Sequence, residues 1–191
     1  YAPMMQKYNP KWGMGDIIIK DRTGEGVIND EDRTVIGNSI PRFTFGLNLG
    51  FEYKGFDFSC FFQGVGKADG YVTMEAIQPM GINGARKEHY KESFNPQDPK
   101  PGAYFPRILS SDYNYAYMSH WVQDASYIRL KNLQIGYSFK IKGLNQLRVY
   151  ASGENLFTAT KYRTWDPETP VGARGFYPNV AVYSMGVNLN F

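Results

Sequence analysis

Apolar and polar side chains alternate along the last residues of the chain. From residue 183 to residue 191, one face of an extended strand is wholly apolar or aromatic, and the other carries only serine, glycine and asparagine. A strand of about 9–11 residues with two such faces is typical of a transmembrane β-strand, whereas strands of soluble sheets average about five or six residues. The pattern therefore favours a membrane strand over a half-buried strand of a soluble sheet. The apolar face carries Tyr183, Met185, Val187, Leu189 and Phe191.

A second alternating stretch predicts a β-hairpin over residues 43–63. Apolar residues occupy the odd positions from 43 to 53 and the even positions from 56 to 62, and Lys54-Gly55 separates the two runs. A two-residue turn at Lys54-Gly55 would place both apolar sets on one face of the hairpin. The pairs that this turn predicts are Tyr53–Phe56, Phe51–Phe58, Leu49–Cys60 and Leu47–Phe62.

The second half of the chain repeats this organisation with strands predicted over residues 127–139 and 147–154. Short turns alternate with long loops rich in glycine and proline. Because antiparallel neighbours return to the side that they left, all short turns would lie at one end of the sheet and all long loops at the other, as in outer-membrane barrels. The short turns are residues 54–55 and 140–146, and the long loops are residues 64–118 and 157–177.

These regularities predict an all-β fold, specifically an antiparallel transmembrane β-barrel segment with long extracellular loops. We expect residues 1–42 to form an extracellular loop region with an acidic turn, and residues 43–191 to form C-terminal transmembrane barrel strands and their loops. Within the loops, residues 16–20 are predicted to form a short strand, and residues 85–92 at most a short helix.

Composition agrees with this interpretation. Aromatic residues make up 16% of the chain although its mean hydropathy is negative, and no segment approaches the about 20 consecutive apolar residues of a membrane helix. The net charge of +3 is spread along the chain without a basic run, so nucleic acid is not an expected partner. A chain that starts at Tyr1 without a signal peptide is expected to be processed or to be part of a longer protein.

No combination of residues predicts an enzyme. Cys60 is the only cysteine and falls on an apolar strand face, so we interpret it as a small apolar filler rather than a nucleophile. His89 and His120 have no partner at metal or catalytic spacing. A single cysteine provides neither a disulfide framework within the chain nor the spacing of a cysteine-based zinc site.

An acidic stretch, residues 21–32, has the spacing of a twelve-residue calcium-binding loop. Gly26 falls at the sharp turn of such a loop, and hard oxygen ligands fall at the positions that coordinate the ion. The alternative is a solvated turn held by hydrogen bonds from backbone groups to side chains. The predicted Ca²⁺ ligands are Asp21, Thr23, Glu25, the carbonyl of Val27, Asn29 and Asp32.

Several blocks of the sequence together resemble the SusC/RagA-type TonB-dependent transporters. The resemblance spans nearly the whole chain and is weakest in the loop over residues 67–118. The acidic turn departs from the commoner form of the family at Thr23 and Glu25, which puts an inherited cation site in question. The blocks are residues 15–37, 41–47, 51–57, 61–64, 124–133 and 153–158.

The resemblance implies a 22-stranded barrel in the outer membrane of a Gram-negative bacterium, of which this chain would carry the last five strands. A plug and the segment that the TonB complex grips would lie upstream. The family imports glycan or peptide fragments, usually with a SusD-like surface lipoprotein as a lid. In outer-membrane barrels the terminal aromatic is part of the signal for assembly, so removal of Phe191 is expected to impair insertion. The predicted assembly signal is the apolar face of the last strand, Tyr183, Met185, Val187, Leu189 and Phe191.

Aromatic side chains of the loops are the candidate contacts to substrate or lid, since sugars and peptides bind aromatic faces. The alternative for each is that it only packs its own loop. A different interpretation of the whole chain is a soluble, secreted, calcium-dependent carbohydrate-binding β-sandwich. The candidate contact residues are Tyr71, Tyr104, Phe105, Tyr113, Tyr115, Tyr117 and Trp165.

Overall fold

The computed structural model describes all residues except 73–76, 80–83, 100, 109–112, 164 and 170–176. The chain forms two compact units. The first, which we call the loop unit, consists of residues 1–37 and 72–122, and the second, the sheet unit, of residues 38–71 and 123–191. This division differs from the expected boundary at residue 42, because the long loop after the first hairpin folds with the N-terminal residues.

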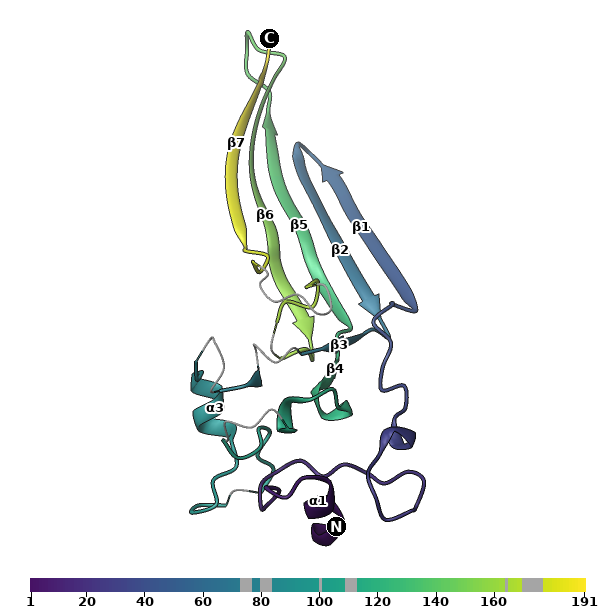
Figure 1. Ribbon diagram of the computed structural model, residues 1–191. Helices are drawn as coiled ribbons and strands as arrows, with labels where there is room; N and C mark the ends of the chain where they lie inside the picture. Colours follow the sequence, from purple (N-terminus) through teal and green to yellow (C-terminus); the bar gives the residue numbers. More distant parts are fainter. Residues whose placement is uncertain (73–76, 80–83, 100, 109–112, 164, 170–176) are drawn as a thin grey trace. The chain divides into compact units, whose positions relative to one another are not determined.

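The sheet unit is built on one antiparallel sheet of five strands in the order β1-β2-β5-β6-β7 (Figure 1). The predicted all-β antiparallel class is confirmed. The two short turns lie at one end of this sheet and the long connections leave from the other (Figure 1). The strands are β1 (Phe43–Tyr53), β2 (Phe56–Gly66), β5 (Tyr127–Phe139), β6 (Gln146–Thr160) and β7 (Val182–Asn190); a separate two-stranded sheet pairs β3 (Asp69–Tyr71) with β4 (Val122–Asp124).

The β1–β2 hairpin has the predicted register. Lys54 and Gly55 form the turn with positive φ angles of 50° and 87°, which is the geometry that a two-residue hairpin turn of the primed type requires. Tyr53 lies opposite Phe56, and the pairing continues without interruption to Phe43 opposite Gly66. All four predicted pairs are therefore confirmed.

A β-bulge at Lys131 keeps the apolar side chains of β5 on one face. Leu130 pairs with Phe62 of β2, and the next paired residue, Asn132, lies opposite Phe61, so Lys131 has no partner in this register. In a regular strand without the bulge, Leu130 and Leu133 are three positions apart and would point to opposite sides of the sheet. The apolar residues of β5 change from even positions up to Leu130 to odd positions from Leu133, and the bulge compensates for this change. It also places Lys131 on the polar face, where it reaches Glu168.

The apolar face of the sheet is exposed. Leu47 of β1 is 50% exposed, Ile135 of β5 is 43% exposed and Val187 of β7 is 59% exposed. A β-sandwich would bury these side chains against a second sheet. No second sheet covers them within the residues that the structure describes, so the alternative of a soluble sandwich is not favoured.

On the polar face, an ion pair crosses three strands over a glycine. Arg148 of β6 donates from Nη2 to Oδ1 of Asp57 of β2 at 2.6 Å and from Nε to Oδ2 at 2.9 Å. The intervening strand contributes Gly136, where a Cβ atom would lie 2.4 Å from the Asp57 carboxylate and 2.8 Å from Arg148 Nε. Any larger residue at this position would therefore push the ion pair apart.

Gly136→Ala is expected to destabilise the folded protein by roughly 1–3 kcal/mol through this overpacking. The matched control is Gly50→Ala in β1, where a Cβ would meet only the Phe58 carbonyl oxygen at 3.4 Å. Urea titration of the intact protein, folded in detergent micelles, measures both. An equal loss of stability in the two variants would contradict a specific role for Gly136.

Within the residues that the structure describes, the helices of the loop unit are short: α1 (Ala2–Tyr8), η1 (Asp30–Asp32), α3 (Lys87–Glu92), η2 (Tyr113–Tyr115) and η3 (Ser119–Trp121). The short helix predicted over residues 85–92 corresponds to α3. Every helix in the described residues is too short or too polar to cross a membrane. The buried side chains of this unit include those of Met5, Val72, Ile77, Tyr115 and Trp121, all at most 1% exposed.

Asp16 joins the two parts of the loop unit. Its carboxylate accepts hydrogen bonds from the Arg107 guanidinium at 2.6 and 2.8 Å and from Asn114 Nδ2 at 2.8 Å. The Asp16 side chain is 1% exposed. Burial acts to raise the pKa of this carboxyl, but the hydrogen bonds from Arg107 and Asn114 outweigh it and lower the pKa below its usual value.

The strand predicted over residues 16–20 does not form. The N–H of Ile17 donates to Asn114 Oδ1 at 3.0 Å, and its carbonyl accepts from Tyr113 Oη at 2.7 Å and from Trp12 Nε1 at 3.1 Å. Side chains therefore take the place of a neighbouring strand at this residue. The prediction was wrong because a run of isoleucines indicates strand propensity but supplies no strand to pair with.

Candidate functional site

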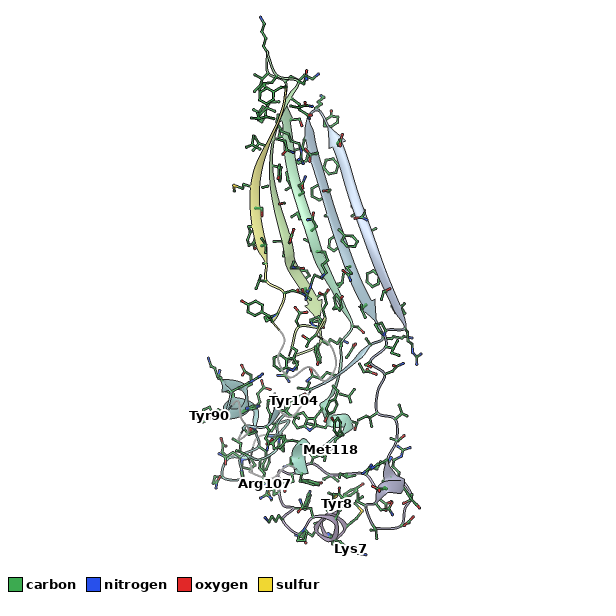
Figure 2. The ribbon with its side chains drawn as sticks, turned by 45° about the horizontal axis from the view of Figure 1, so that its top comes forward. Lys7, Tyr8, Tyr90, Tyr104, Arg107 and Met118 are labelled. Carbon is green, nitrogen blue, oxygen red and sulfur yellow. The ribbon has the colours of Figure 1, made fainter. Side chains whose placement is uncertain are left out.

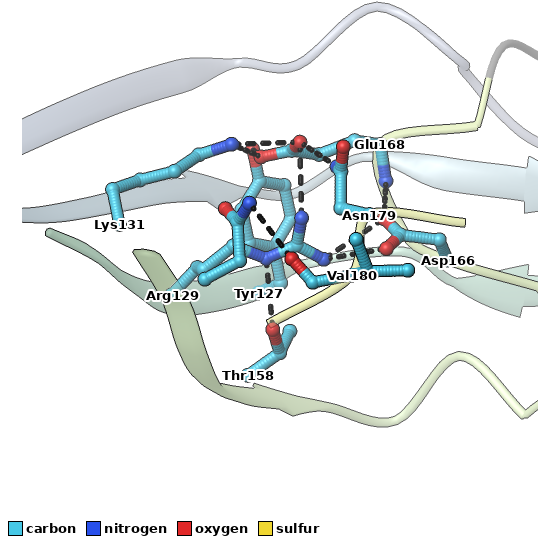
Figure 3. Close-up of polar contacts among 9 residues, drawn as sticks. Tyr127, Arg129, Lys131, Thr158, Asp166, Glu168, Asn179 and Val180 are labelled. Atoms are coloured by element: carbon cyan, nitrogen blue, oxygen red, sulfur yellow. Dashed lines mark hydrogen bonds and ion pairs between the residues drawn. The ribbon is translucent and has the colours of Figure 1, made fainter. Parts of the chain in front are cut away.

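A cluster of charged side chains lies on the polar face of the sheet unit, near the long-loop ends of β5 and β6 (Figure 3). Its centre is Arg129 of β5, which is 2% exposed. The Arg129 guanidinium donates to both carboxylate oxygens of Asp166, at 2.8 and 2.9 Å, and to Glu168 Oε2 at 3.1 Å. Its Nε donates to Thr158 Oγ1 of β6 at 2.8 Å, so the guanidinium bonds in three directions.

Glu168 collects the remaining members of the cluster. Lys131 Nζ lies 2.8 Å from Glu168 Oε1, Tyr127 Oη donates to Oε1 at 2.9 Å, and Asn179 Nδ2 donates to Oε2 at 2.6 Å (Figure 3). Burial acts to raise the pKa of Glu168, but hydrogen bonds from Lys131 and Tyr127 and the nearby positive charges lower it below its usual value. Glu168 is therefore held ionised at neutral pH.

The cluster attaches the loop after β6 to the wall formed by β5 and β6. Asp166 and Glu168 belong to this loop, and the turn that presents them is closed by Thr169 N–H donating to the Asp166 carbonyl at 2.9 Å. Two cations face two carboxylates, so the charges balance. Beside the cluster lies a cavity of about 350 Å³, whose walls include Gln63, Lys131 and Tyr162. The arrangement can fix the loop and present polar groups to a small polar solute.

A larger groove of about 1360 Å³ lies within the loop unit. Of the predicted contact residues, Tyr104, Phe105 and Tyr117 line it, and Tyr117 is 84% exposed. Tyr104 stacks on His120 with ring centroids 5.4 Å apart, and its carbonyl lies 2.8 Å from His120 Nε2. Figure 2 shows Tyr104, together with Tyr8, Arg107 and Met118, in this unit. Contact between these aromatic side chains and a solute stays a prediction.

Two predicted contact residues, buried Tyr115 and half-buried Tyr113, make contacts within their own unit instead. Tyr115 is 1% exposed and stacks on Trp121, and burial raises the pKa of its hydroxyl to about 12. Tyr113 uses its hydroxyl for the Ile17 carbonyl, and burial raises its pKa as well. For Tyr115 and Tyr113 the structure supports the alternative that they pack their own unit. Tyr71 and Trp165 do not line the groove. Tyr71 is the last residue of β3, and Trp165 immediately precedes Asp166.

The acidic turn is closed by its own carboxylates. Asp32 accepts hydrogen bonds from the backbone N–H of Arg22 at 2.6 Å and of Asn29 at 3.0 Å. Asp21 accepts from the N–H of Gly24 at 2.6 Å and of Gly26 at 2.7 Å. These hydrogen bonds from backbone N–H groups to carboxylates are those expected of a solvated turn that needs no ion. Among the described residues no group of three or more His, Cys, Asp or Glu is placed to hold a metal, and Ca²⁺ binding stays a prediction.

The hydrogen bonds in this turn predict its response to pH and to substitution. Backbone donors at Asn29 and Arg22 lower the pKa of Asp32, so the stability that this carboxylate contributes is present above about pH 4 and is lost as the pH falls further. Asp32→Asn should reduce the hydrogen-exchange protection of residues 21–32 in the intact protein at pH 7. Asp30→Asn is the control, because among the described residues the Asp30 carboxylate forms an ion pair only with the exposed Arg33.

The same measurement tests calcium. Added Ca²⁺ should increase protection of the wild-type turn, and EDTA should reverse the increase, if the predicted ligands bind the ion. Equal protection in wild type and Asp32→Asn would contradict the role of the carboxylate. Unchanged protection on adding Ca²⁺ would contradict the predicted ion site.

The residues predicted as an assembly signal share the apolar face of the sheet unit. Met185 is 90% exposed, and Tyr183 and Leu189 are 77% and 54% exposed. Val187 lies opposite Val149 of β6. The face predicted from the alternation is therefore present, and its part in assembly stays a prediction, as does the effect of removing Phe191.

The sequence did not predict the cluster at Arg129. Its signal is Arg129 and Lys131 on a strand whose neighbours are apolar, together with Asp166 and Glu168 spaced two residues apart in a loop. The pairing joins residues 37 apart in sequence, and no local pattern specifies that distance.

Comparisons with known proteins agree with this fold. No family model matches the chain. The chain is 34% identical over 93% of its length to TonB-dependent receptor P3 of Formosa agariphila, and 27% identical over 90% of its length to TonB-dependent receptor SusC of Bacteroides thetaiotaomicron. It spans about a fifth of the length of these curated relatives, 19% and 17% respectively.

The fold is similar to a chain of the RagAB peptide importer. The solved structure in the closed-closed state superposes with a TM-score of 0.65 and 25% sequence identity, covering 82% of this chain and 18% of that one. The open-open state gives a TM-score of 0.63 over 81% of this chain. The similarity extends over both the sequence and the backbone of most of the chain.

Proposed function

This chain belongs to the SusC/RagA type of TonB-dependent receptors, and we propose that it forms barrel wall and extracellular loops of an outer-membrane importer of oligomeric nutrients. The relatives named above are receptors and importers rather than enzymes. Under this proposal the chain makes and breaks no bond. It contributes a surface for lipid, a surface for the solute pathway, and loops that meet the incoming solute.

The observation that carries the proposal is the division of the five-stranded sheet into two unlike faces. One face exposes large apolar side chains from β1, β5, β6 and β7, and the aromatic side chains of β2 on the same face are half-buried among them, which suits contact with hydrocarbon. The other face carries the Asp57–Arg148 pair and the cluster at Arg129, which require water or polar partners. A single sheet with these two faces is suited to the wall of a solute pathway.

The partners follow from the family and are proposals for the whole protein. A SusD-like surface lipoprotein would act at the extracellular loops, and the TonB complex would act through a segment outside this chain. The imported solute would be an oligosaccharide or oligopeptide fragment, and the energy would come from the inner-membrane proton gradient through TonB.

Uptake by living cells tests the function. A strain that carries the intact gene should accumulate labelled oligosaccharide or oligopeptide, and deletion of the gene, deletion of tonB or addition of a protonophore should each abolish this uptake. The intact protein should fractionate with the outer membrane and need detergent for extraction. Unchanged uptake in the deletion strain, or extraction without detergent, would contradict the proposal.

A further inference from the structure

One wall of the groove in the loop unit is a segment of backbone with unused hydrogen-bonding groups. Ile18, Ile19 and Lys20 line the groove and belong to no helix or strand. Whereas the backbone of Ile17 is satisfied by side chains, the N–H and carbonyl groups of these three residues form no hydrogen bond with any residue that the structure describes. An unpaired run of this kind is a template for an added strand.

The sequence of this segment suits such pairing. Consecutive isoleucines followed by lysine have high strand propensity, which is why a strand is predicted there from the sequence. A peptide that lies extended along an unpaired edge gains main-chain hydrogen bonds, and pockets beside the edge accept its side chains. The missing element is a partner strand, and the groove provides the space for one.

The lining of the groove distinguishes a peptide from a glycan. Besides Tyr104 and Phe105, it includes the aliphatic side chains of Ile19, Ile28 and Ile36. Sugar rings bind by stacking on aromatic faces and by dense polar contacts, whereas branched aliphatic side chains of a peptide bury directly against isoleucine. The aliphatic part of the lining therefore favours peptide.

The accessible charge of the groove is positive. Three of its carboxylates are committed: Asp16 to Arg107, Asp30 to Arg33, and Asp32 to backbone N–H groups. Lys20 and Arg22 are exposed, and within the described residues no carboxylate pairs with either side chain. The groove is therefore complementary to acidic side chains.

From these observations we propose that the groove binds an extended oligopeptide with acidic and branched aliphatic side chains, whose backbone pairs with residues 18–20. The proposal rests on the proposed function and deepens it, because it selects oligopeptide as the class of solute recognised by this unit. The peptide lies along Ile18 to Lys20, its carboxylates face Lys20 and Arg22, and its aliphatic side chains face the isoleucines.

Fluorescence anisotropy with the intact receptor in detergent, purified without the surface lipoprotein, tests the proposal. The probe is a labelled ten-residue peptide of alternating glutamate and valine, compared with a lysine–valine peptide and a neutral oligosaccharide of similar mass. Lys20→Glu/Arg22→Glu should weaken binding of the acidic peptide by about tenfold or more and improve binding of the basic one. Lys7→Glu is the matched control, since Lys7 is exposed in the same unit and does not line the groove.

A second probe isolates the backbone contribution. The acidic peptide with alternate amide nitrogens methylated keeps its charges but loses half of its main-chain donors, and it should bind about tenfold or more weakly. Equal binding of the methylated and unmethylated peptides, or unchanged binding by the charge-reversed receptor, would overturn the proposal. If charge reversal instead releases the surface lipoprotein and leaves peptide binding intact, the groove belongs to that partner and the proposal also fails.

The uptake assay separates this failure from failure of the function itself. A strain that imports oligosaccharide but not acidic peptide would keep the proposed importer and overturn the peptide groove. A strain with no gene-dependent uptake of either solute would overturn the proposed function.

Discussion

Replacing Val187 with arginine should cost the folded protein about 2–4 kcal/mol if the residue lies near the bilayer midplane, whereas Asn188→Arg should cost much less. Val187 is 59% exposed on the apolar face of β7, and Asn188 lies on the polar face opposite Arg148. A guanidinium on the apolar face would have to leave water for hydrocarbon. On the polar face the new charge stays hydrated, and Arg148 is already balanced by Asp57.

Refolding of the intact protein into lipid vesicles, followed by urea titration, measures this difference. The two substitutions are adjacent in β7, so they lie at nearly the same depth and differ mainly in the face from which they project. Equal costs would show that the two faces meet the same environment. That result would remove the assignment of the apolar face to lipid.

The sheet could be predicted from the sequence because the alternation of apolar residues and the turn residues indicate the same pairing. Alternation with a period of two records which face each residue occupies, and the turn chemistry of Lys54-Gly55 sets the register. A slip of one residue would have moved Phe56, Phe58, Cys60 and Phe62 of β2 to the polar face. The sequence therefore specified the hairpin down to individual pairs such as Leu47 with Phe62.

The fold of the loop unit could not be predicted from the sequence in the same way. Its organisation depends on Asp16, whose partners Arg107 and Asn114 lie more than 90 residues further along the chain. No periodic pattern links them, and the isoleucine run after Asp16 gave a misleading indication of a strand. The acidic turn lies between these two cases. Its position was predicted from the spacing of its residues, because its hydrogen bonds join residues within one short segment.

Arg129→Met should destabilise the attachment of the loop after β6 by about 3–5 kcal/mol, which is the usual cost of removing one partner from a buried ion pair. Arg129 is 2% exposed and the Asp166 side chain is 8% exposed, so the substitution leaves a carboxylate with little access to water. Glu168 retains Lys131, and the damage should therefore centre on Asp166. Hydrogen exchange of residues 165–169 in the intact protein should become much faster.

A second substitution distinguishes lost attraction from a stranded charge. Arg129→Met/Asp166→Asn should recover part of the lost stability, because the neutral amide needs no counter-ion. Lys140→Met, at an exposed position in the turn between β5 and β6, is the control for removing a positive charge and should leave exchange of residues 165–169 unchanged. Slow exchange in Arg129→Met would show that the loop is held by other contacts. Fast exchange with no recovery in the double variant would show that the guanidinium acts through its three-way bonding, including Thr158, more than through its charge.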